Sequence, residues 1–369
     1  MQCVSAIICL SDSSEEIGKI MKVYMKFKRT FLPLWFLLVM GLLAQTALSQ
    51  QPSQQPKVKA VDAIGITISD MDRAVDFYSN VLSFKKVSDI VVEGEGYEEL
   101  LGVPDLRIRV VRMQLGDEFI SLIQYIEPSD GKPIPVDSRS NDLWFQHFAI
   151  VVSDMDKAYE HLRKHKVSHI STNPQTLPKS NKPAAGIRAF KFKDPDGHPL
   201  ELLWFPPNKG DARWHRPTDK LFLGIDHTAI SVNDTEASLK FYRDLLGMNV
   251  LGGSLNIGTE QDNLDNVSGA RVRITALRPS ANIPGIEFLE YVSPENGRPT
   301  PSDIKANDIV HWQTILIVDD VEVAEKWLRE HNVRFVSDEV SILTGGKLGF
   351  KNGIEVLDPD GHAMLIVGK

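Results

Sequence analysis

Apolar and polar residues alternate in two ways along residues 60–369. Short runs with a period of two indicate strands, and four of these runs lead into a segment whose apolar residues are spaced three or four apart. That spacing is typical of an amphipathic helix, and three more strand-like runs follow each helix. The pattern therefore predicts an α+β fold built from four βαβββ modules.

Each predicted helix begins just after an aspartate that ends the first strand of its module. The four residues are Asp70, Asp154, Asp234 and Asp320. An aspartate in this place accepts hydrogen bonds from the free N–H groups of the first helical turn. We expect all four to be helix N-caps.

The modules are related as internal repeats. Residues 61–84 match residues 225–248 without a gap, and residues 145–167 match residues 311–333 in the same way. The first half of the chain, with modules 1 and 2, is therefore repeated in the second half, with modules 3 and 4.

The N-terminal segment has the pattern of a processing signal. The apolar run 31–44 follows Lys26 and Arg29, and small residues follow it up to Ser49. This order predicts a signal peptide cleaved near Ser49 and an exported protein, periplasmic or extracellular. An uncleaved membrane anchor at 31–44 is the alternative. The predicted segments are a leader and signal peptide (1–49), a linker (50–58), a first domain (59–207), a second linker (208–221) and a second domain (222–369).

Composition narrows the chemistry. The net charge is -8 and no basic stripe appears, which argues against nucleic acid as a partner. Both cysteines, Cys3 and Cys9, lie in the leader. The chain after the leader thus has no thiol for a disulfide, a nucleophile or a metal ligand.

Two motifs carry a resemblance to a known family. A Phe-Tyr pair followed by leucine recurs on the helices of modules 1 and 3, and the turn Asp-Pro-Asp-Gly-His precedes the last strand at 194–198 and 358–362. This arrangement resembles the vicinal oxygen chelate superfamily, which includes glyoxalase I, epimerases, extradiol dioxygenases and bleomycin-resistance proteins. The resemblance implies two domains with half-open barrels of mixed sheet. It also implies metal ligands on the first and last strands of each module.

The ligand positions differ among the modules. On the first strand they are Ala63, His147, His227 and Gln313, and on the last strand they are Ser121, Glu201, Glu287 and Leu365. Glu290 competes with Glu287 but points to the opposite face on a period of two. His311 shares a face with Gln313 and is a fallback ligand.

Pairing of the modules decides whether a site exists. If module 1 pairs with 2 and module 3 with 4, each barrel holds one histidine and one glutamate. If module 2 pairs with 3, one barrel holds His147, Glu201, His227 and Glu287, and the other holds no strong ligand. We favour the second arrangement, since two imidazoles and two carboxylates suit a first-row divalent ion.

The resemblance then implies a metal-dependent lyase or isomerase of the glyoxalase or epimerase type. One divalent ion (Zn, Ni, Co, Mn or Fe) would bind the four residues, and Glu201 or Glu287 would act as the base. The substrate would be a small 2-oxo or vicinal-oxygen compound. An extradiol-type dioxygenase and a non-enzymatic small-molecule binding protein are the alternatives. The processed chain is expected to be a monomer or homodimer, without a membrane partner.

Overall fold

The computed structural model describes residues 54–280 and 284–369. The predicted signal peptide and the cleavage near Ser49 lie outside the described residues. Within those ranges, the helices are too short or too polar for any of them to cross a membrane.

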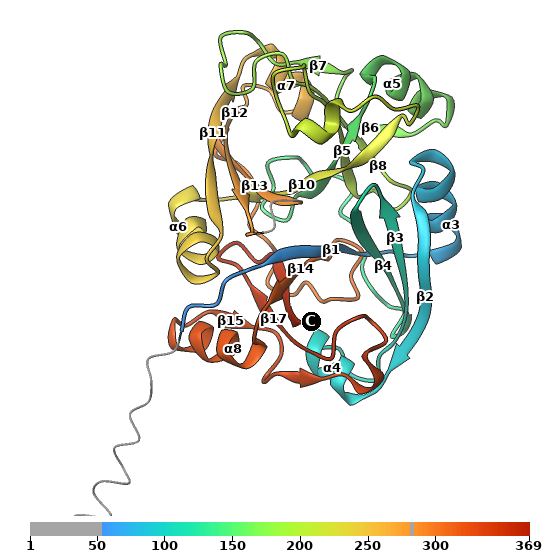
Figure 1. The fold of residues 1–369 in the computed structure, drawn as a ribbon, viewed down its shortest axis with the longest axis vertical. Helices are drawn as coiled ribbons and strands as arrows, with labels where there is room; N and C mark the ends of the chain where they lie inside the picture. The colour runs from blue at the N-terminus through green and yellow to red at the C-terminus, as the bar shows by residue number, and fades with distance from the viewer. Residues whose placement is uncertain (1–53, 281–283) are drawn as a thin grey trace, which may run out of the picture. The chain divides into compact units, whose positions relative to one another are not determined.

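The four predicted modules are present, each with a first strand, a helix and further strands (Figure 1). Module 1 contains β1 (Ala60–Thr67), α3 (Met71–Asp76), η1 (Phe77–Val81), β2 (Lys85–Glu93), α4 (Glu95–Leu101), β3 (Arg107–Leu115) and β4 (Glu118–Glu127). Module 2 contains β5 (Gln146–Val152), α5 (Met155–Lys164), β6 (Ser168–His169), β7 (Gln175–Thr176), β8 (Arg188–Lys193) and β9 (Pro199–Trp204).

The second half repeats this order after the short helical turn η2 (Ala212–His215). Module 3 contains β10 (Phe222–Val232), α6 (Thr235–Leu239), η3 (Lys240–Leu245), β11 (Asn249–Ile257), α7 (Thr259–Asp265), β12 (Arg271–Arg278) and β13 (Gly285–Ser293). Module 4 contains β14 (Trp312–Val318), α8 (Val321–Glu330), β15 (Arg334–Phe335), β16 (Ser341–Ile342), η4 (Thr344–Gly346), β17 (Asn352–Leu357) and β18 (Ala363–Gly368).

The four aspartates cap their helices as expected. Each has an extended backbone, and its carboxylate accepts a hydrogen bond from a backbone N–H two or three residues further on. The capping residues are Asp70, Asp154, Asp234 and Asp320. This side-chain acceptor replaces the partner that the first helical turn lacks, so the prediction is confirmed.

The described strands form two sheets of nine, and each sheet takes one module from each half of the chain. Sheet A joins module 1 to module 4 through the antiparallel pair β1 and β14. Sheet B joins module 2 to module 3 through the antiparallel pair β5 and β10. The expected pairing of module 2 with module 3 is therefore confirmed, and the two joins lie in separate layers in Figure 1.

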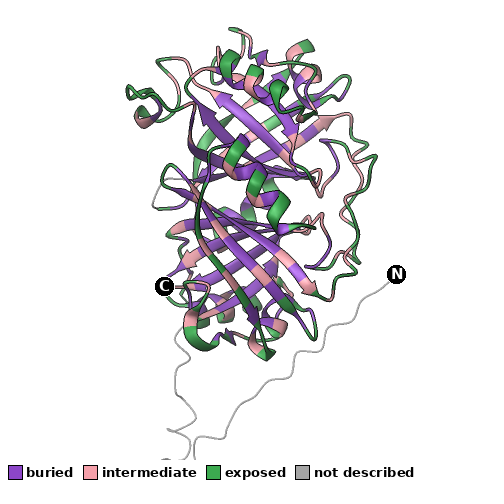
Figure 2. Cartoon of the chain, turned by 90° about the vertical axis from the view of Figure 1, so that its right-hand side faces the viewer, coloured by how far each residue is buried: buried purple, intermediate pink, exposed green. Residues whose placement is uncertain are grey.

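The outer faces of the two sheets pack on each other and on the helices. One core cluster combines Ile64 of sheet A and Phe148 of sheet B with residues of α3 and α5. A second cluster combines Ile230 of sheet B and Leu316 of sheet A with residues of α6 and α8. Figure 2 shows the strands largely buried and the exposed residues gathered on helices and loops. Burial of these apolar faces is the main source of stability. It leaves the concave face of sheet B for a site.

Candidate metal centre

The four candidate ligands lie on four adjacent strands of sheet B. His147 is on β5 and His227 is on β10, the two strands at the centre of the sheet. Glu201 on β9 flanks β5, and Glu287 on β13 flanks β10, both in parallel. The site therefore combines a histidine and a glutamate from each half of the chain.

Two alanines separate the ligands in register. Ala149 is paired with Glu201 on one side and with His227 on the other. Ala229 is paired with His147 on one side and with Glu287 on the other. Both alanines are fully buried. Because neighbouring strands are about 4.8 Å apart, a larger side chain at either position would fill the space between a histidine and a glutamate.

The imidazole and carboxylate groups converge. His147 Nε2 lies 3.3 Å from Glu201 Oε2, and His227 Nε2 lies 4.0 Å from the same oxygen. His227 Nε2 also lies 3.4 Å from Glu287 Oε2. The ligand atoms of His147, Glu201 and His227 all lie within 4.8 Å of one another. Glu201 thus lies between the two histidines, and Glu287 joins the group through its contact with His227.

The His147 ring gives a test of whether a metal would fit. The residue is 1% exposed, and neither ring nitrogen makes a hydrogen bond of good geometry, although Glu201 Oε2 lies 3.3 Å from Nε2. A buried polar atom without a partner costs about 1–3 kcal/mol, and burial lowers the pKa of His147 to about 4 despite the nearby Glu201. A divalent ion binds a neutral imidazole through a free ring nitrogen, close to other ligand atoms. The Nε2 atom of His147 is in this situation, because it points toward two other potential ligands. The residues present therefore fit such an ion.

The second imidazole is oriented by an aspartate that the sequence analysis did not single out. Asp226 Oδ2 accepts a hydrogen bond of 3.0 Å from His227 Nδ1. A β-bulge between Ile225 and His227 makes Asp226 an extra residue on β10, which lets neighbouring side chains meet. With Nδ1 bound to Asp226, Nε2 faces Glu201 and Glu287. A carboxylate that fixes the ring in this way is common beside metal-bound histidines.

Charges in the site shift the pKa values in opposite directions. Burial raises the pKa of Glu201, but its interactions with His147, Lys191 and His227 outweigh burial and bring that pKa to about 2. Burial raises the pKa of Glu287, and the attraction of His227 offsets this only in part. Burial lowers the pKa of His227, yet Glu287, Asp226 and Glu201 raise it overall. The two glutamates, equivalent in the repeat, thus have different environments.

A buried lysine lies beside Glu201. Lys191 on β8 is paired in register with Glu201, and its Nζ donates a hydrogen bond of 2.6 Å to Asp265 Oδ1. The other Asp265 oxygen accepts hydrogen bonds of 2.6 Å each from Gln261 Nε2 and Tyr291 Oη. The Lys191 and Asp265 side chains are 3% and 0% exposed. A charged pair at this depth is tolerated because both partners are hydrogen-bonded.

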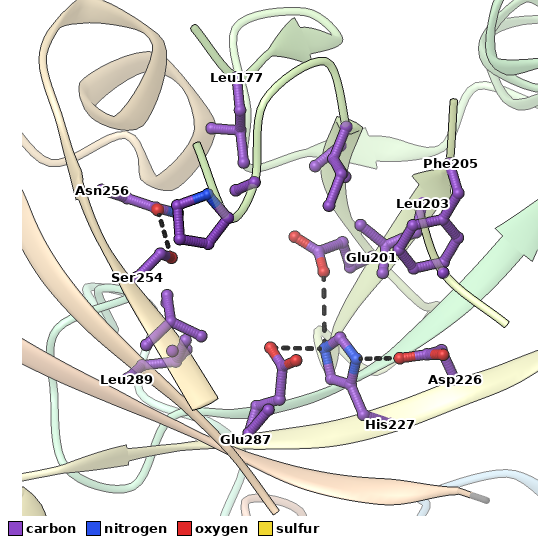
Figure 3. A pocket seen from close by; sticks show the side chains of 18 of the residues that line it. Leu177, Glu201, Leu203, Phe205, Asp226, His227, Ser254, Asn256, Glu287 and Leu289 are labelled. Carbon is purple, nitrogen blue, oxygen red and sulfur yellow. Dashed lines mark hydrogen bonds and ion pairs between the residues drawn. The ribbon is translucent and has the colours of Figure 1, made fainter. Parts of the chain in front are cut away.

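These residues line a cavity of about 550 Å³ on the concave face of sheet B. In Figure 3, Glu201, His227 and Glu287 point toward one another at one end, and Leu177, Ser254 and Asn256 lie at the other. The apolar part of the lining includes Leu177, Ile187, Leu203, Phe205, Leu251 and Leu289. The cavity can hold a molecule with oxygen atoms at one end and an apolar surface along its body.

The corresponding space in sheet A is filled. Ala63, Ser121, Gln313 and Leu365 are all buried there. Apolar residues such as Leu100, Ile108 and Phe350 pack over them and leave a cavity of about 40 Å³. His311, the fallback ligand, lies 4.0 Å from Glu355 Oε1 rather than among several donors. Within the described residues, sheet A forms no group of three histidine or acidic ligands.

The competing residues of the sequence analysis lie elsewhere. Glu290 is on the opposite face of β13, where it accepts hydrogen bonds from Thr235 and Arg273. His198, in the first Asp-Pro-Asp-Gly-His turn, lies 2.9 Å from Asp194 and 2.7 Å from the Ile309 carbonyl oxygen. Such contacts tie the turn to its surroundings, as a structural histidine would.

The repeats match a family model. The model of the Glyoxalase/Bleomycin resistance protein/Dioxygenase superfamily matches residues 60–202 and again residues 224–366. The chain belongs to this superfamily. The two matches correspond to the two halves of the chain, and the resemblance inferred from the Phe-Tyr and Asp-Pro-Asp-Gly-His motifs is confirmed.

Two relatives of this chain are enzymes. A 2-epi-5-epi-valiolone epimerase of Actinomyces sp is 30% identical over 155 residues, which cover 41% of this chain and 82% of the relative. A lactoylglutathione lyase of Arabidopsis thaliana is 26% identical over 184 residues, which cover 50% of this chain and 53% of the relative. The chain therefore spans about half the length of the second relative.

The crystal structure of glyoxalase I from Zea mays has a similar fold. Its TM-score is 0.56 at 16% identity, with 84% of this chain and 92% of that chain covered. At this identity the likeness concerns the arrangement of modules alone.

Asp226 and Lys191 were missed, although each leaves a trace in the sequence. Asp226 directly precedes the ligand His227. Lys191 stands between Phe190 and Phe192, but Arg188 and Lys193 at the ends of the same strand are also basic, so only the flanking aromatic residues mark it.

Proposed function

We propose that this protein is a metal-dependent lyase or isomerase that moves a proton at a carbon next to a carbonyl group. The observation that carries the proposal is the convergence of His147, Glu201, His227 and Glu287 from two halves of the chain in one buried cavity. Two imidazoles and two carboxylates suit a first-row divalent ion. The substrate class is a small 2-oxo or vicinal-oxygen compound.

Three of the four residues would hold the metal ion, and the fourth would move a proton. When bound, a divalent ion would supply Lewis acidity toward a carbonyl oxygen. His147, Glu201 and His227 would hold it, because their ligand atoms all lie within 4.8 Å of one another and all three residues are buried. Glu287 would act as the base: its side chain is 20% exposed toward the cavity, against 7% for Glu201, and it contacts one histidine rather than two. A carboxylate at the edge of the ligand set can move toward a substrate proton with little disturbance of metal binding by the other three residues.

The relatives support the reaction class. One is an epimerase and the other a lyase. Enolisation next to a carbonyl is a step that an ordered carboxylate base beside a divalent ion can promote. The apolar walls of the cavity would limit the water around that step.

Metal analysis of the purified full chain tests the proposal. We expect close to one divalent ion per chain, lost in a variant that combines Glu201→Leu with His227→Ala. The matched control is Gln313→Ala, which removes the equivalent of His147 in sheet A and should leave the metal content unchanged. Metal absent from the wild type, or retained in the double variant, would refute the assignment.

A second function is favoured by one observation. His147, Glu201 and His227 alone form a two-histidine, one-carboxylate group, the ligand set of many iron-dependent oxygenases. An extradiol dioxygenase loaded with Fe²⁺ would consume oxygen in the presence of a catechol. Oxygen uptake that survives Glu287→Gln would select this function, since ring cleavage needs three ligands and the proposed proton transfer needs the fourth residue.

A further inference from the structure

The cations of the cavity are already matched by anions. Among the described residues, Lys191 and Arg278 are the cationic side chains that line it, apart from the two histidines. Lys191 is paired with Asp265 at 2.6 Å, and Arg278 Nη2 is paired with Asp226 at 3.0 Å. A cation already paired in a buried place gains little from a second anion. Neither residue therefore carries an unbalanced positive charge for a carboxylate or phosphate of a ligand.

The remaining charged residues of the cavity lining also provide no partner for an anionic ligand. A divalent ion would balance Glu201 and Glu287. Among the described residues that line the cavity, Asp211, an exposed residue, is then the charge left without a balancing partner there. It is negative, so the lining offers no unbalanced positive charge that would recognise an anionic ligand.

The cavity also contains an unused acceptor. Gln261 is 2% exposed, and its Nε2 donates to Asp265. Its Oε1 is buried beside the cavity without a hydrogen-bond partner. The amide cannot usefully turn around, because Asp265 requires the donor on its side. An oxygen held in this way is satisfied by a ligand that supplies an O–H group.

Resting on the proposed function, we infer that the substrate is an uncharged ketone that carries hydroxyl groups, one of which donates to Gln261. Ser254 and Asn256, which also line the cavity, provide further polar contacts for hydroxyls. The apolar side chains of Leu203, Phe205 and Leu289 provide a surface for the carbon frame. A thioester or thioacetal with charged groups, or a phosphorylated sugar, does not fit this lining.

Three six-carbon ketones separate charge from hydroxyl recognition. Inosose is an uncharged ring ketone with hydroxyls on all other carbons, 2-hydroxycyclohexanone retains only the hydroxyl next to the carbonyl, and 5-ketogluconate is an anion. Dissociation constants are measured by calorimetry on the metal-loaded full chain, and exchange of the α-hydrogen for deuterium is followed by NMR. We expect inosose to bind about tenfold or more tightly than 5-ketogluconate.

The variant Gln261→Met tests the acceptor. It should weaken inosose binding about tenfold, the worth of one buried hydrogen bond, and leave 2-hydroxycyclohexanone unchanged. A purely structural role would weaken both probes alike, which overturns the assignment to Gln261. Binding of 5-ketogluconate as tight as that of inosose, or no binding of either uncharged probe, overturns the inference on charge. If probes bind but none exchanges its α-hydrogen, the proposed function fails while the binding constants still decide the charge preference.

Discussion

Lys191 and Glu355 occupy equivalent places in the two sheets. Each lies directly across from the position that distinguishes the barrels, Lys191 from Glu201 and Glu355 from Leu365. Lys191 is bound to Asp265, whereas one carboxylate oxygen of Glu355 has no hydrogen-bond partner. The charged side chain at this position therefore has a partner in the barrel with the cavity, and it lacks a full set of hydrogen-bond partners in the filled barrel.

Glu355 should make the protein less stable as the pH rises. Burial raises its pKa from the ordinary 4.5 to about 8 in the folded chain. Between these values the folded state holds a proton that the unfolded state has lost, so stability is full below pH 4.5 and declines toward pH 8. We expect Glu355→Gln to remove this decline and to stabilise the protein at pH 8 by roughly 2–4 kcal/mol, since each unit of pKa is worth about 1.4 kcal/mol.

The measurement is urea unfolding of wild type and variant at pH 5 and pH 8. His311, 4.0 Å from Glu355, has a pKa that burial lowers to about 4, so it stays neutral across this range. Equal pH dependence in the two proteins would show that Glu355 is ionised in the folded state.

Lys191 and Asp265 should behave as one unit. Removing a single partner of a buried ion pair leaves the other charge without compensation, which costs about 3–5 kcal/mol. We expect Lys191→Met and Asp265→Asn each to destabilise the protein by this order, and the double variant by clearly less than the sum. Denaturant unfolding of the four proteins gives the coupling free energy. Additive losses would contradict a direct pair.

Asp226→Asn should weaken metal binding without removing a ligand. Asp226 orients the His227 ring, and loss of such a contact typically lowers metal affinity about 10–100-fold. A chelator competition assay measures the effect. The matched control is Asp62→Asn, because Asp62 is the extra residue of the equivalent bulge on β1 and binds Arg112 and Lys369 instead of a histidine. Equal changes in metal affinity for the two variants would rule out the orienting role.

Metal removal should lower the thermal stability of the folded chain. A ligand that binds only the folded state at 100 times its dissociation constant stabilises it by about 2.7 kcal/mol. We expect a chelator to reduce the Tm of the wild type and of Gln313→Ala, and to have no effect on His147→Ala. A chelator effect that persists in His147→Ala would place the metal elsewhere.

Strand alternation and helix caps were readable from the sequence because they depend on local geometry. The period of two fixed the face of Glu201 and of Glu287, and the aspartate caps marked where each module turns into its helix. The pairing of modules 2 and 3 followed from chemistry, since only that pairing brings all four ligands together.

The contacts around the ligands were not readable in the same way. Asp226 reaches His227 through a bulge, which depends on how two distant strands pair. Lys191 binds Asp265, which lies in a different module on the short helix α7. The filled interior of sheet A likewise results from α4 and the loop near Phe350 packing inside it, a tertiary arrangement that strand patterns do not encode.

The exchange of modules between the halves has a consequence for how this protein could diverge. Two separate copies of one half, paired by symmetry, would build two identical barrels, and every substitution would change both at once. In a single chain, each barrel has its own set of positions. Substitutions could therefore remove the metal ligands from one barrel and fill its interior. Glu201 and its partners could be kept in the other barrel at the same time.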